Sequence, residues 1–338
     1  MISTVSIASS RISRHHFRRS FRSLPALAVT VASILFSDRS LFVRASPCPA
    51  KGGVHSDNYH SGKSGSVGGT DTPEPAIATR EGGSGDREGR GETNSEFWKR
   101  VRRSESMSWT CHGDSNGEMV DKLLRSGIVQ SERIAEAMKQ IDRADYVLTK
   151  STAYEDSPQP IGFNVTISAP HMHGYCLAFL ENHLQPGNRV LDVGSGSGYL
   201  TAVMALLVGP TGRAVGVEHI PELVERSRAA VKAGRAAELM DGGQLSIHEA
   251  DGRHGYPDAG PYDAIHVGAA APELPQALVD QLKPGGRMVI PVGRFMQDLE
   301  VIDKGADGTV TRTTAMGVRY VPLTAKAKQL GREGVSSV

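Results

Sequence analysis

The chain has 338 residues, 39% of them hydrophobic and 22% charged, and its 38 basic side chains nearly balance 37 acidic ones. A formal net charge of +1 gives no reason to expect nucleic acid as a partner. The three cysteines, Cys48, Cys111 and Cys176, are too few and too scattered for a disulfide framework, and they show no paired metal-ligand spacing. The composition therefore favours a globular protein of a reducing compartment and predicts no metal site.

Residues 1–45 have the composition of a targeting segment. Serines and arginines are frequent in its first half, and no acidic residue precedes Asp38. The apolar stretch at 24–36 is interrupted by polar residues and a proline, and it is shorter than the about 20 residues of a membrane span. We therefore expect no stable membrane association. A transit peptide, a secretory signal and a non-functional extension all fit this segment.

Residues 46–106 are predicted to be a disordered linker rich in glycine and serine. Such a composition cannot bury enough apolar surface to offset its chain entropy. Phe97 and Trp98 are expected to form at most a brief turn. We place the folded domain at residues 107–330 and a flexible tail at residues 331–338.

The folded domain is expected to open with two helices and to continue as alternating strands and helices. Met119, Leu123 and Leu124 repeat at helical spacing up to Gly127, and Ser131 is placed to cap the next helix. The later elements are expected to be helices at about 173–182, 199–207, 221–233 and 274–281, strands at 189–193, 214–218, 245–249, 262–267 and 287–291, and a hairpin of 298–302 with 311–315. This rhythm predicts an α/β fold, a Rossmann-like, doubly wound and mostly parallel sheet with helices on both faces.

A glycine-rich turn follows the first strand of this alternation. Gly194, Gly196 and Gly198 let the backbone approach a ligand at the start of a helix, where free N–H groups point outward. The dinucleotide fingerprint would require its third glycine at position 199, which is a tyrosine here. The spacing therefore favours the shorter motif of methyltransferases over a dehydrogenase, with Asp192 and Ser195 in the same turn.

Two carboxylates stand at the ends of the next two strands. Glu218 is placed to accept hydrogen bonds from both hydroxyls of a ribose, and Asp251 is placed to accept one from an adenine amino group. Gly252 beside Asp251 permits close approach of the ligand. Together with the turn, these positions predict an adenosine-containing cofactor, although both acids would also fit as caps of helices or turns.

The sequence is similar to the protein-L-isoaspartate (D-aspartate) O-methyltransferase family over residues 107–330. The most specific segments are Ile167-Ser168-Ala169-Pro170-His171 and Gly268-Ala269-Ala270-Ala271-Pro272. The segments around Asp192 and Asp251, which many methyltransferases share, and Tyr320-Val321-Pro322-Leu323-Thr324 add to the resemblance. One departure is Gly260, where the family more often has alanine or serine, and it removes only a methyl group.

The resemblance implies a class I S-adenosylmethionine-dependent methyltransferase whose last strands are swapped in order. Ser168 corresponds to the active-site serine and is implied to orient the acceptor carboxylate. S-adenosyl-L-methionine is the implied cofactor. The residues expected to bind it are Val165, Thr166, Ile167, Ser168, His173, Asp192, Gly194, Ser195, Gly196, Glu218, His219, Asp251, Gly252 and Thr324.

The implied acceptor is an L-isoaspartyl residue in an age-damaged protein or peptide, with D-aspartyl residues as a second class. Methylation of its α-carboxyl makes a better leaving group, so the backbone nitrogen closes a succinimide that hydrolyses partly to normal aspartate. A carboxylate is already ionised at pH 7, so positioning and desolvation matter more than a general base. We expect a monomer, cytoplasmic by resemblance, with an organelle or the secretory route through residues 1–45 as the alternative.

Alternatives remain open at several positions. On sequence alone, Ser168 also fits a turn or cap residue. His171 and His173 suggest a metal site, but no third ligand lies at a helpful spacing. The alternative functions are a methyltransferase for a different acceptor and a cofactor-binding protein or adaptor without turnover. The retained Ser168 and the short polar tail favour an active enzyme.

Overall fold

The computed structural model describes residues 94–331. The predictions for residues 1–45, for 46–93 and for 332–338 lie outside the described residues. Among the helices of the described part, none is long and apolar enough to cross a bilayer.

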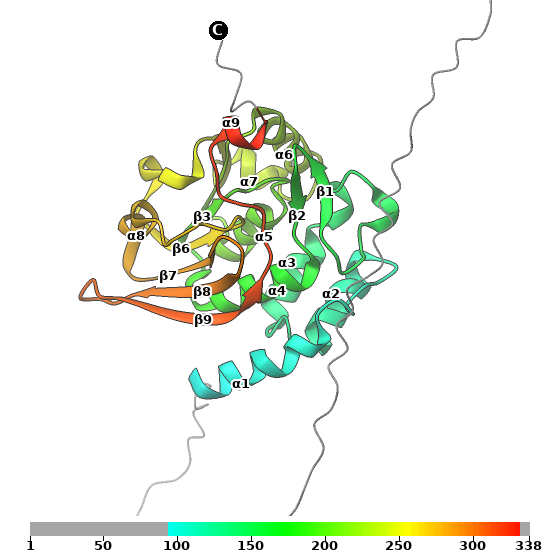
Figure 1. Ribbon diagram of the computed structural model, residues 1–338. Coiled ribbons are helices and arrows are strands. Elements are labelled where there is room, and N and C mark those ends of the chain that lie inside the picture. The colour runs from blue at the N-terminus through cyan, green and yellow to red at the C-terminus, as the bar shows by residue number, and fades with distance from the viewer. Residues whose placement is uncertain (1–93, 332–338) are drawn as a thin grey trace, which may run out of the picture. The chain divides into compact units, whose positions relative to one another are not determined.

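Within residues 94–331 a seven-stranded sheet forms the centre of the fold (Figure 1). Its order is β5–β4–β3–β6–β7–β8–β9; the first five strands are parallel, and β8 and β9 are antiparallel to their neighbours. The strands are β3 (Arg189–Val193), β4 (Arg213–Glu218), β5 (Leu245–Glu249), β6 (Tyr262–Val267), β7 (Leu282–Val292), β8 (Gln297–Lys304) and β9 (Val310–Val318). The predicted α/β, mostly parallel sheet is confirmed, and its last three strands lie side by side in chain order.

Helices cover both faces of the sheet. Successive strand residues point to opposite sides, and apolar residues on both sides have to be buried. Val190 and Val289 belong to the larger hydrophobic cluster, which α2 to α6 complete, whereas Leu191 and Met288 belong to a second cluster with α8. The helices are α2 (Asn116–Arg125), α3 (Glu132–Gln140), α4 (Pro170–Leu180), α5 (Tyr199–Val208), α6 (Pro221–Ala233), α7 (Ala237–Asp241), α8 (Gln276–Gln281) and α9 (Lys326–Gln329). This arrangement places the carboxyl ends of β3, β4, β5 and β6 at one edge, where ligands of such sheets bind.

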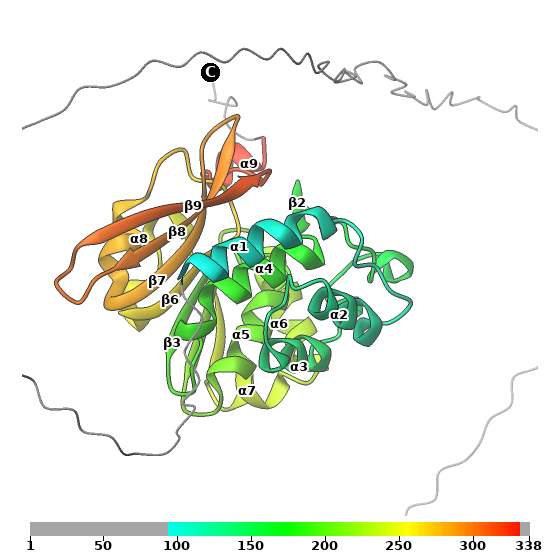
Figure 2. The ribbon, with the colours of Figure 1, turned by 90° about the horizontal axis from the view of Figure 1, so that it is seen from below.

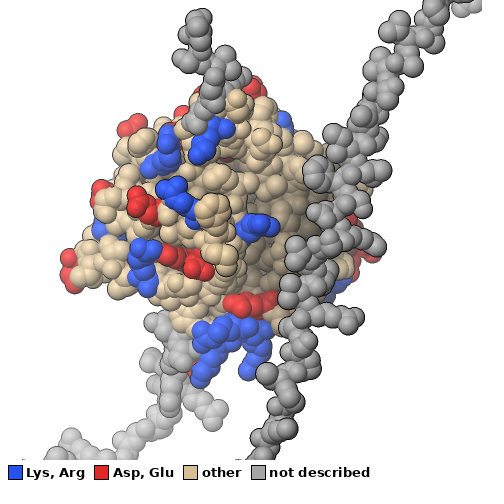
Figure 3. Space-filling model, viewed as in Figure 1, with Lys and Arg blue, Asp and Glu red and all other residues tan. Residues whose placement is uncertain are grey.

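The predicted linker is wrong for its last part, because residues Asn94–Ser104 form helix α1. Phe97 and Trp98 pack on Phe179 of α4, with ring centroids 5.9 and 5.5 Å away, and Val101 is fully buried. Figure 2 shows α1 running beside α4. The outer side of α1 carries a group of basic residues, which is visible at the bottom of Figure 3. Above it, acidic and basic residues are mixed on the surface.

Several boundaries differ from the prediction for local reasons. α4 begins at Pro170 rather than near His173, since proline is favoured in the first turn of a helix. The hairpin of β1 (Gln159–Gly162) and β2 (Val165–Ile167) was not predicted. Ser131 caps α3 as predicted, its hydroxyl accepting from the N–H of Ile134 at 3.3 Å.

Candidate active site

The glycine turn after β3 takes a backbone conformation that residues with a side chain rarely adopt. Gly194, Gly196 and Gly198 have φ of 72°, 52° and 82°, in the left-handed region that glycine enters at no steric cost. A Cβ on Gly196 would lie 3.2 Å from Cδ1 of Ile161. The backbone N–H of Gly194 donates to Val217 O at 2.9 Å, so the turn is fastened to the end of β4.

Glu218, the last residue of β4, points its buried carboxylate at this turn. Its Oε2 accepts from the N–H of Gly196 at 3.2 Å and its Oε1 from that of Ile220 at 3.0 Å. Burial raises the pKa of Glu218, and these N–H groups offset only part of that effect. The Glu218 carboxylate caps nearby backbone N–H groups and still has lone pairs for the hydroxyls of a ligand. Its two predicted roles, as a cap and as an acceptor for ribose hydroxyls, are therefore compatible.

The loop after β5 is held against the glycine turn. A Cβ on Gly252 would lie 2.6 Å from Cγ1 of Val193, so any larger residue would push this loop away. Asp251 caps the short turn Gly252–His254, its Oδ1 accepting from the N–H of Arg253 at 3.0 Å. The Arg253 side chain also contacts this carboxylate and lowers the pKa of Asp251. The fold therefore brings together the three predicted positions at strand ends: the glycine turn after β3, Glu218 after β4 and Asp251 after β5.

Asp192 lies beneath the turn rather than on its open side. Its Oδ1 is 2.8 Å from Nδ1 of His266 and its Oδ2 accepts from the Thr201 hydroxyl at 2.5 Å. The carboxylate is fully buried among these partners. This arrangement fits a role in holding the turn, and direct contact of Asp192 with a cofactor stays a prediction. The Ser195 hydroxyl is buried beside Gly216 without a hydrogen-bond partner.

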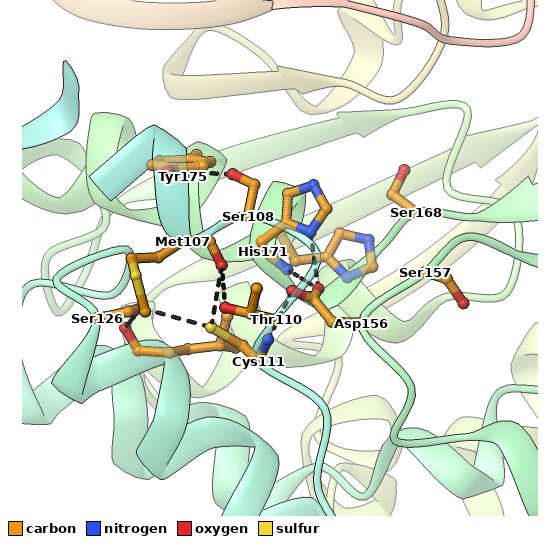
Figure 4. Close-up of polar contacts among 12 residues, drawn as sticks. Met107, Ser108, Thr110, Cys111, Ser126, Asp156, Ser157, Ser168, His171 and Tyr175 are labelled. Atoms are coloured by element: carbon orange, nitrogen blue, oxygen red, sulfur yellow. Dashed lines mark hydrogen bonds and ion pairs between the residues drawn. The ribbon is translucent and has the colours of Figure 1, made fainter. Parts of the chain in front are cut away.

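Ser168 lies between β2 and α4, beside the same turn. In β2, which precedes Ser168, Val165 and Ile167 are buried and Thr166 is exposed. The strand lies against the glycine turn, since a Cβ on Gly196 would be 3.9 Å from Cγ1 of Val165. Ser168 is half-buried, and its hydroxyl lies near the phenol of Tyr320. In Figure 4 this hydroxyl points away from the neighbouring pair of Asp156 and His171.

Arg143 is a central residue that the sequence did not reveal. Its fully buried guanidinium donates to Ser168 O at 2.8 Å and to Ala153 O at 3.0 Å, and it lies over the ring of Tyr199 at 5.8 Å. Burial lowers the pKa of Arg143 to about 10. The arginine therefore fixes the backbone of the serine segment against the start of α5. No local signal marks it, because its partners are carbonyl groups that only the fold brings together.

The two histidines of α4 have structural partners. The ring of His173 lies against that of Tyr199, with centroids 5.1 Å apart and planes tilted by 31°, and burial followed by the charge of Arg143 lowers the pKa of His173 well below its usual value. His171 Nδ1 is 2.7 Å from Asp156 Oδ1 (Figure 4). Within residues 94–331, no three His, Cys, Asp or Glu side chains gather as metal ligands would.

The segment after β9 crosses the same edge of the sheet. Leu323 N–H donates to Ala270 O at 2.8 Å, which places Thr324 near the ends of β3 and β6. In α9, Gln329 hydrogen bonds to Nε2 of His219 at 3.0 Å and donates to Phe163 O, in the β1–β2 turn, at 3.3 Å. Thr324 thus lies on a segment that spans from His219, just after β4, to the β1–β2 hairpin.

The comparisons with known proteins agree with this geometry. The family profile described as protein-L-isoaspartate(D-aspartate) O-methyltransferase (PCMT) matches residues 114–328. The chain belongs to this family. The predicted site residues, from 165 to 324, all lie within the PCMT match, whereas α1 precedes it.

Similar proteins carry the family's name. A protein-L-isoaspartate O-methyltransferase from Triticum aestivum is 59% identical over 217 residues, which cover 64% of this chain and 94% of the relative. One from Caenorhabditis elegans is 46% identical, covering 67% and 100%. A Plasmodium falciparum crystal structure, described as a candidate PCMT in complex with S-adenosyl-L-homocysteine, has a TM-score of 0.58 at 35% identity, covering 63% and 99%.

Proposed function

We propose that this protein is a repair enzyme that transfers a methyl group from S-adenosyl-L-methionine to the α-carboxyl of L-isoaspartyl residues in damaged proteins, with D-aspartyl residues as a second acceptor. The observation that carries the proposal is the convergence, in a chain of this family, of the glycine turn and the Ser168 segment at one edge of the sheet. Glu218, Gly252 and Arg143 fasten that arrangement.

The residues at the strand ends fit an adenosyl ligand. Gly194 to Gly198 form a cradle that a side chain at Gly196 would fill, and Glu218 borders it with a buried carboxylate. We assign Glu218 to the ribose hydroxyls and Asp251 to the adenine amino group. Val165, Ile167, His219 and Thr324 are assigned to the surrounding wall, on the segments that enclose the cradle. When bound, the sulfonium of the cofactor supplies an activated methyl group.

The acceptor side requires orientation more than proton transfer. An isoaspartyl α-carboxylate is ionised at pH 7, so no general base is needed to prepare it. The Ser168 hydroxyl donates a hydrogen bond to this carboxylate and holds one oxygen in line with the methyl group. Arg143 fixes the Ser168 backbone from beneath, and the segment 321–324 borders the other side of the cleft. A catalyst of this kind acts by positioning and by excluding water.

Ser168→Ala tests the proposed role. Loss of a hydrogen bond to a charged acceptor costs about 1.5–3 kcal/mol, so kcat/KM for an isoaspartyl peptide should fall about 10- to 150-fold. Ser157→Ala is the matched control. The Ser157 hydroxyl already has a partner within the protein, since it accepts from the Gln159 side chain at 3.0 Å, and no role in binding the acceptor is proposed for it. An unchanged rate in Ser168→Ala would remove the serine from the mechanism.

The setting of the reaction is also proposed. We infer a monomer that acts on flexible, isoaspartyl-containing protein segments, in the cytoplasm or, through residues 1–45, in an organelle or the secretory route. The location in the cell of a C-terminally tagged full chain, compared with that of tagged residues 107–338, distinguishes these compartments. Mass spectrometry of the mature N-terminus shows whether processing occurs near Ala45, and light scattering measures the oligomeric state.

A further inference from the structure

Trp109 is an exposed aromatic residue in a strained backbone conformation. Its φ is 71°, in the left-handed region that a residue with a side chain enters only at a cost and glycine enters freely. It lies inside a tight turn, in which the N–H of Thr110 donates to Met107 O at 3.3 Å. The side chain of Trp109 is 61% exposed, so the fold buries only the smaller part of it. Strained residues of this kind persist where the surrounding structure enforces them, and they gather at sites that hold a ligand.

A buried carboxylate anchors this turn to the helix that follows Ser168. The N–H of Cys111, two residues after Trp109, donates to Oδ2 of Asp156 at 3.1 Å. Oδ1 of the same carboxylate accepts from the N–H of His171 at 3.0 Å and lies 2.7 Å from Nδ1 of the His171 ring. Figure 4 shows Asp156 between Cys111 and His171. Asp156 therefore ties the turn that contains Trp109 to the first turn of α4.

This anchoring places the indole ring beside the proposed acceptor site. The ring lies against that of His171, with centroids 4.8 Å apart. His171 follows Ser168 by three residues, and three residues span at most about 11 Å. The other end of α4 is remote from the site, since Phe179 O accepts from Arg287 of β7 at the level where β6 begins. Trp109 and Ser168 therefore lie at the same end of α4, at the cofactor edge of the sheet.

We propose that Trp109 is a specificity-determining residue, whose indole ring packs on an apolar side chain that flanks the isoaspartyl residue of the acceptor. The inference rests on the proposed function, because it adds a recognition surface to the same acceptor site. A peptide bound in extended form advances about 3.3 Å per residue, so side chains within a few positions of the isoaspartyl residue reach the ring. Tryptophan suits this role because it offers a large, rigid apolar face. The ring favours apolar flanks without reading a defined sequence.

Kinetics of the full chain with two isoaspartyl peptides test this contact. In the leucine peptide the flanking positions on both sides are leucines, in the serine peptide they are serines, and lysines at the ends keep both soluble. Trp109→Ala should raise KM for the leucine peptide about three- to tenfold, since part of the burial of one leucine is lost, while kcat stays within about twofold. KM for the serine peptide should change less than about twofold. Val310→Ala is the control, because Val310 is also exposed but begins β9 at the end remote from the site.

Trp109→Gly separates the effect of the ring from that of the strain. Glycine adopts a φ of 71° freely, so this variant should unfold at a higher urea concentration than Trp109→Ala. Its KM for the leucine peptide should nevertheless rise as far as in Trp109→Ala, because both variants lack the ring. A merely structural ring would raise KM equally for the two peptides or for neither, and either result would overturn the inference. An equal urea midpoint in the two variants would remove the strain on which the inference rests.

Fluorescence reads the contact without turnover, so its failure is separate from failure of the proposed function. The chain has two tryptophans, Trp98 and Trp109, and Trp98→Phe leaves Trp109 as the single reporter. With S-adenosylhomocysteine present, the leucine peptide should cover the ring and shift its emission to shorter wavelength, and the serine peptide should shift it less. Methylation of the leucine peptide without any such shift would overturn the inference. A shift without methylation of either peptide would refute the proposed function and leave the recognition surface intact.

Discussion

Replacement of Arg143 by methionine should impair both catalysis and stability. The change leaves the carbonyl groups of Ala153 and Ser168 without their donors, and each buried unsatisfied group costs about 1–3 kcal/mol. The same change removes a buried charge whose pKa is lowered from 12.5 to about 10, which recovers about 3 kcal/mol. The free energy of unfolding should therefore fall by about 1 kcal/mol and by no more than about 3.

The catalytic loss has a different origin. The freed Ser168 carbonyl lets the serine segment move, and a displacement of about 1 Å at a reacting group costs on the order of a hundredfold. We expect kcat/KM for an isoaspartyl peptide to fall about 10- to 100-fold in Arg143→Met. Urea unfolding and steady-state kinetics on the full chain give the two quantities.

Arg133 supplies a matched control for this prediction. Its guanidinium also donates to carbonyl groups, those of Leu184 at 2.8 Å, Glu181 at 3.0 Å and Leu207 at 3.5 Å, but these lie just after α4 and at the end of α5, remote from Ser168. Arg133→Met should lower stability while kcat/KM stays within about twofold, the usual scatter for an independent site. Equal kinetic losses in both variants, or an unchanged rate in Arg143→Met, would refute the positioning argument.

Three further predictions follow from the site. Gly196→Ala should weaken S-adenosylhomocysteine binding at least about tenfold in calorimetry, because the left-handed conformation costs a larger residue about 1–2 kcal/mol and its Cβ would press on Ile161; unchanged affinity would contradict the cradle. Glu218→Gln should weaken the same binding about five- to tenfold by loss of a charged acceptor, and equal affinity would remove Glu218 from the ribose site. Burial raises the pKa of Asp156, but hydrogen bonds from His171 outweigh it and lower the pKa, so this carboxylate stabilises the fold above about pH 4 and that contribution is lost as the pH falls through the lowered pKa. Asp156→Asn should therefore show a weaker decline of unfolding free energy between about pH 5 and 2, and an unchanged acid profile would contradict the assignment.

The sheet could be predicted from the sequence because its signals are local. Strands such as Arg213–Glu218 are short, mainly apolar segments between turns, and their carboxyl ends must meet at one edge once the sheet is parallel. The positive φ angles of the turn likewise follow from its glycines. Ser168 was singled out only through the family resemblance, since a serine before Ala169 and Pro170 has no catalytic signature of its own.

The remaining features depend on contacts between distant segments. Helix α1 was missed because its three apolar residues, Phe97, Trp98 and Val101, become a stable face only against α4. Arg143 was missed because its acceptors are backbone carbonyl groups, which no side-chain pattern reports. The orientation of Asp192 towards His266, 74 positions later in the chain, is decided by the register of β3 against β6.

The most direct test of the account is methyl transfer from labelled S-adenosylmethionine by residues 107–338, and in parallel by the full chain, which includes α1, to an isoaspartyl peptide and to its normal aspartyl twin. We expect strong labelling of the isoaspartyl peptide alone. Labelling of neither peptide, with the cofactor still bound, would contradict the repair function and favour a binding protein without turnover.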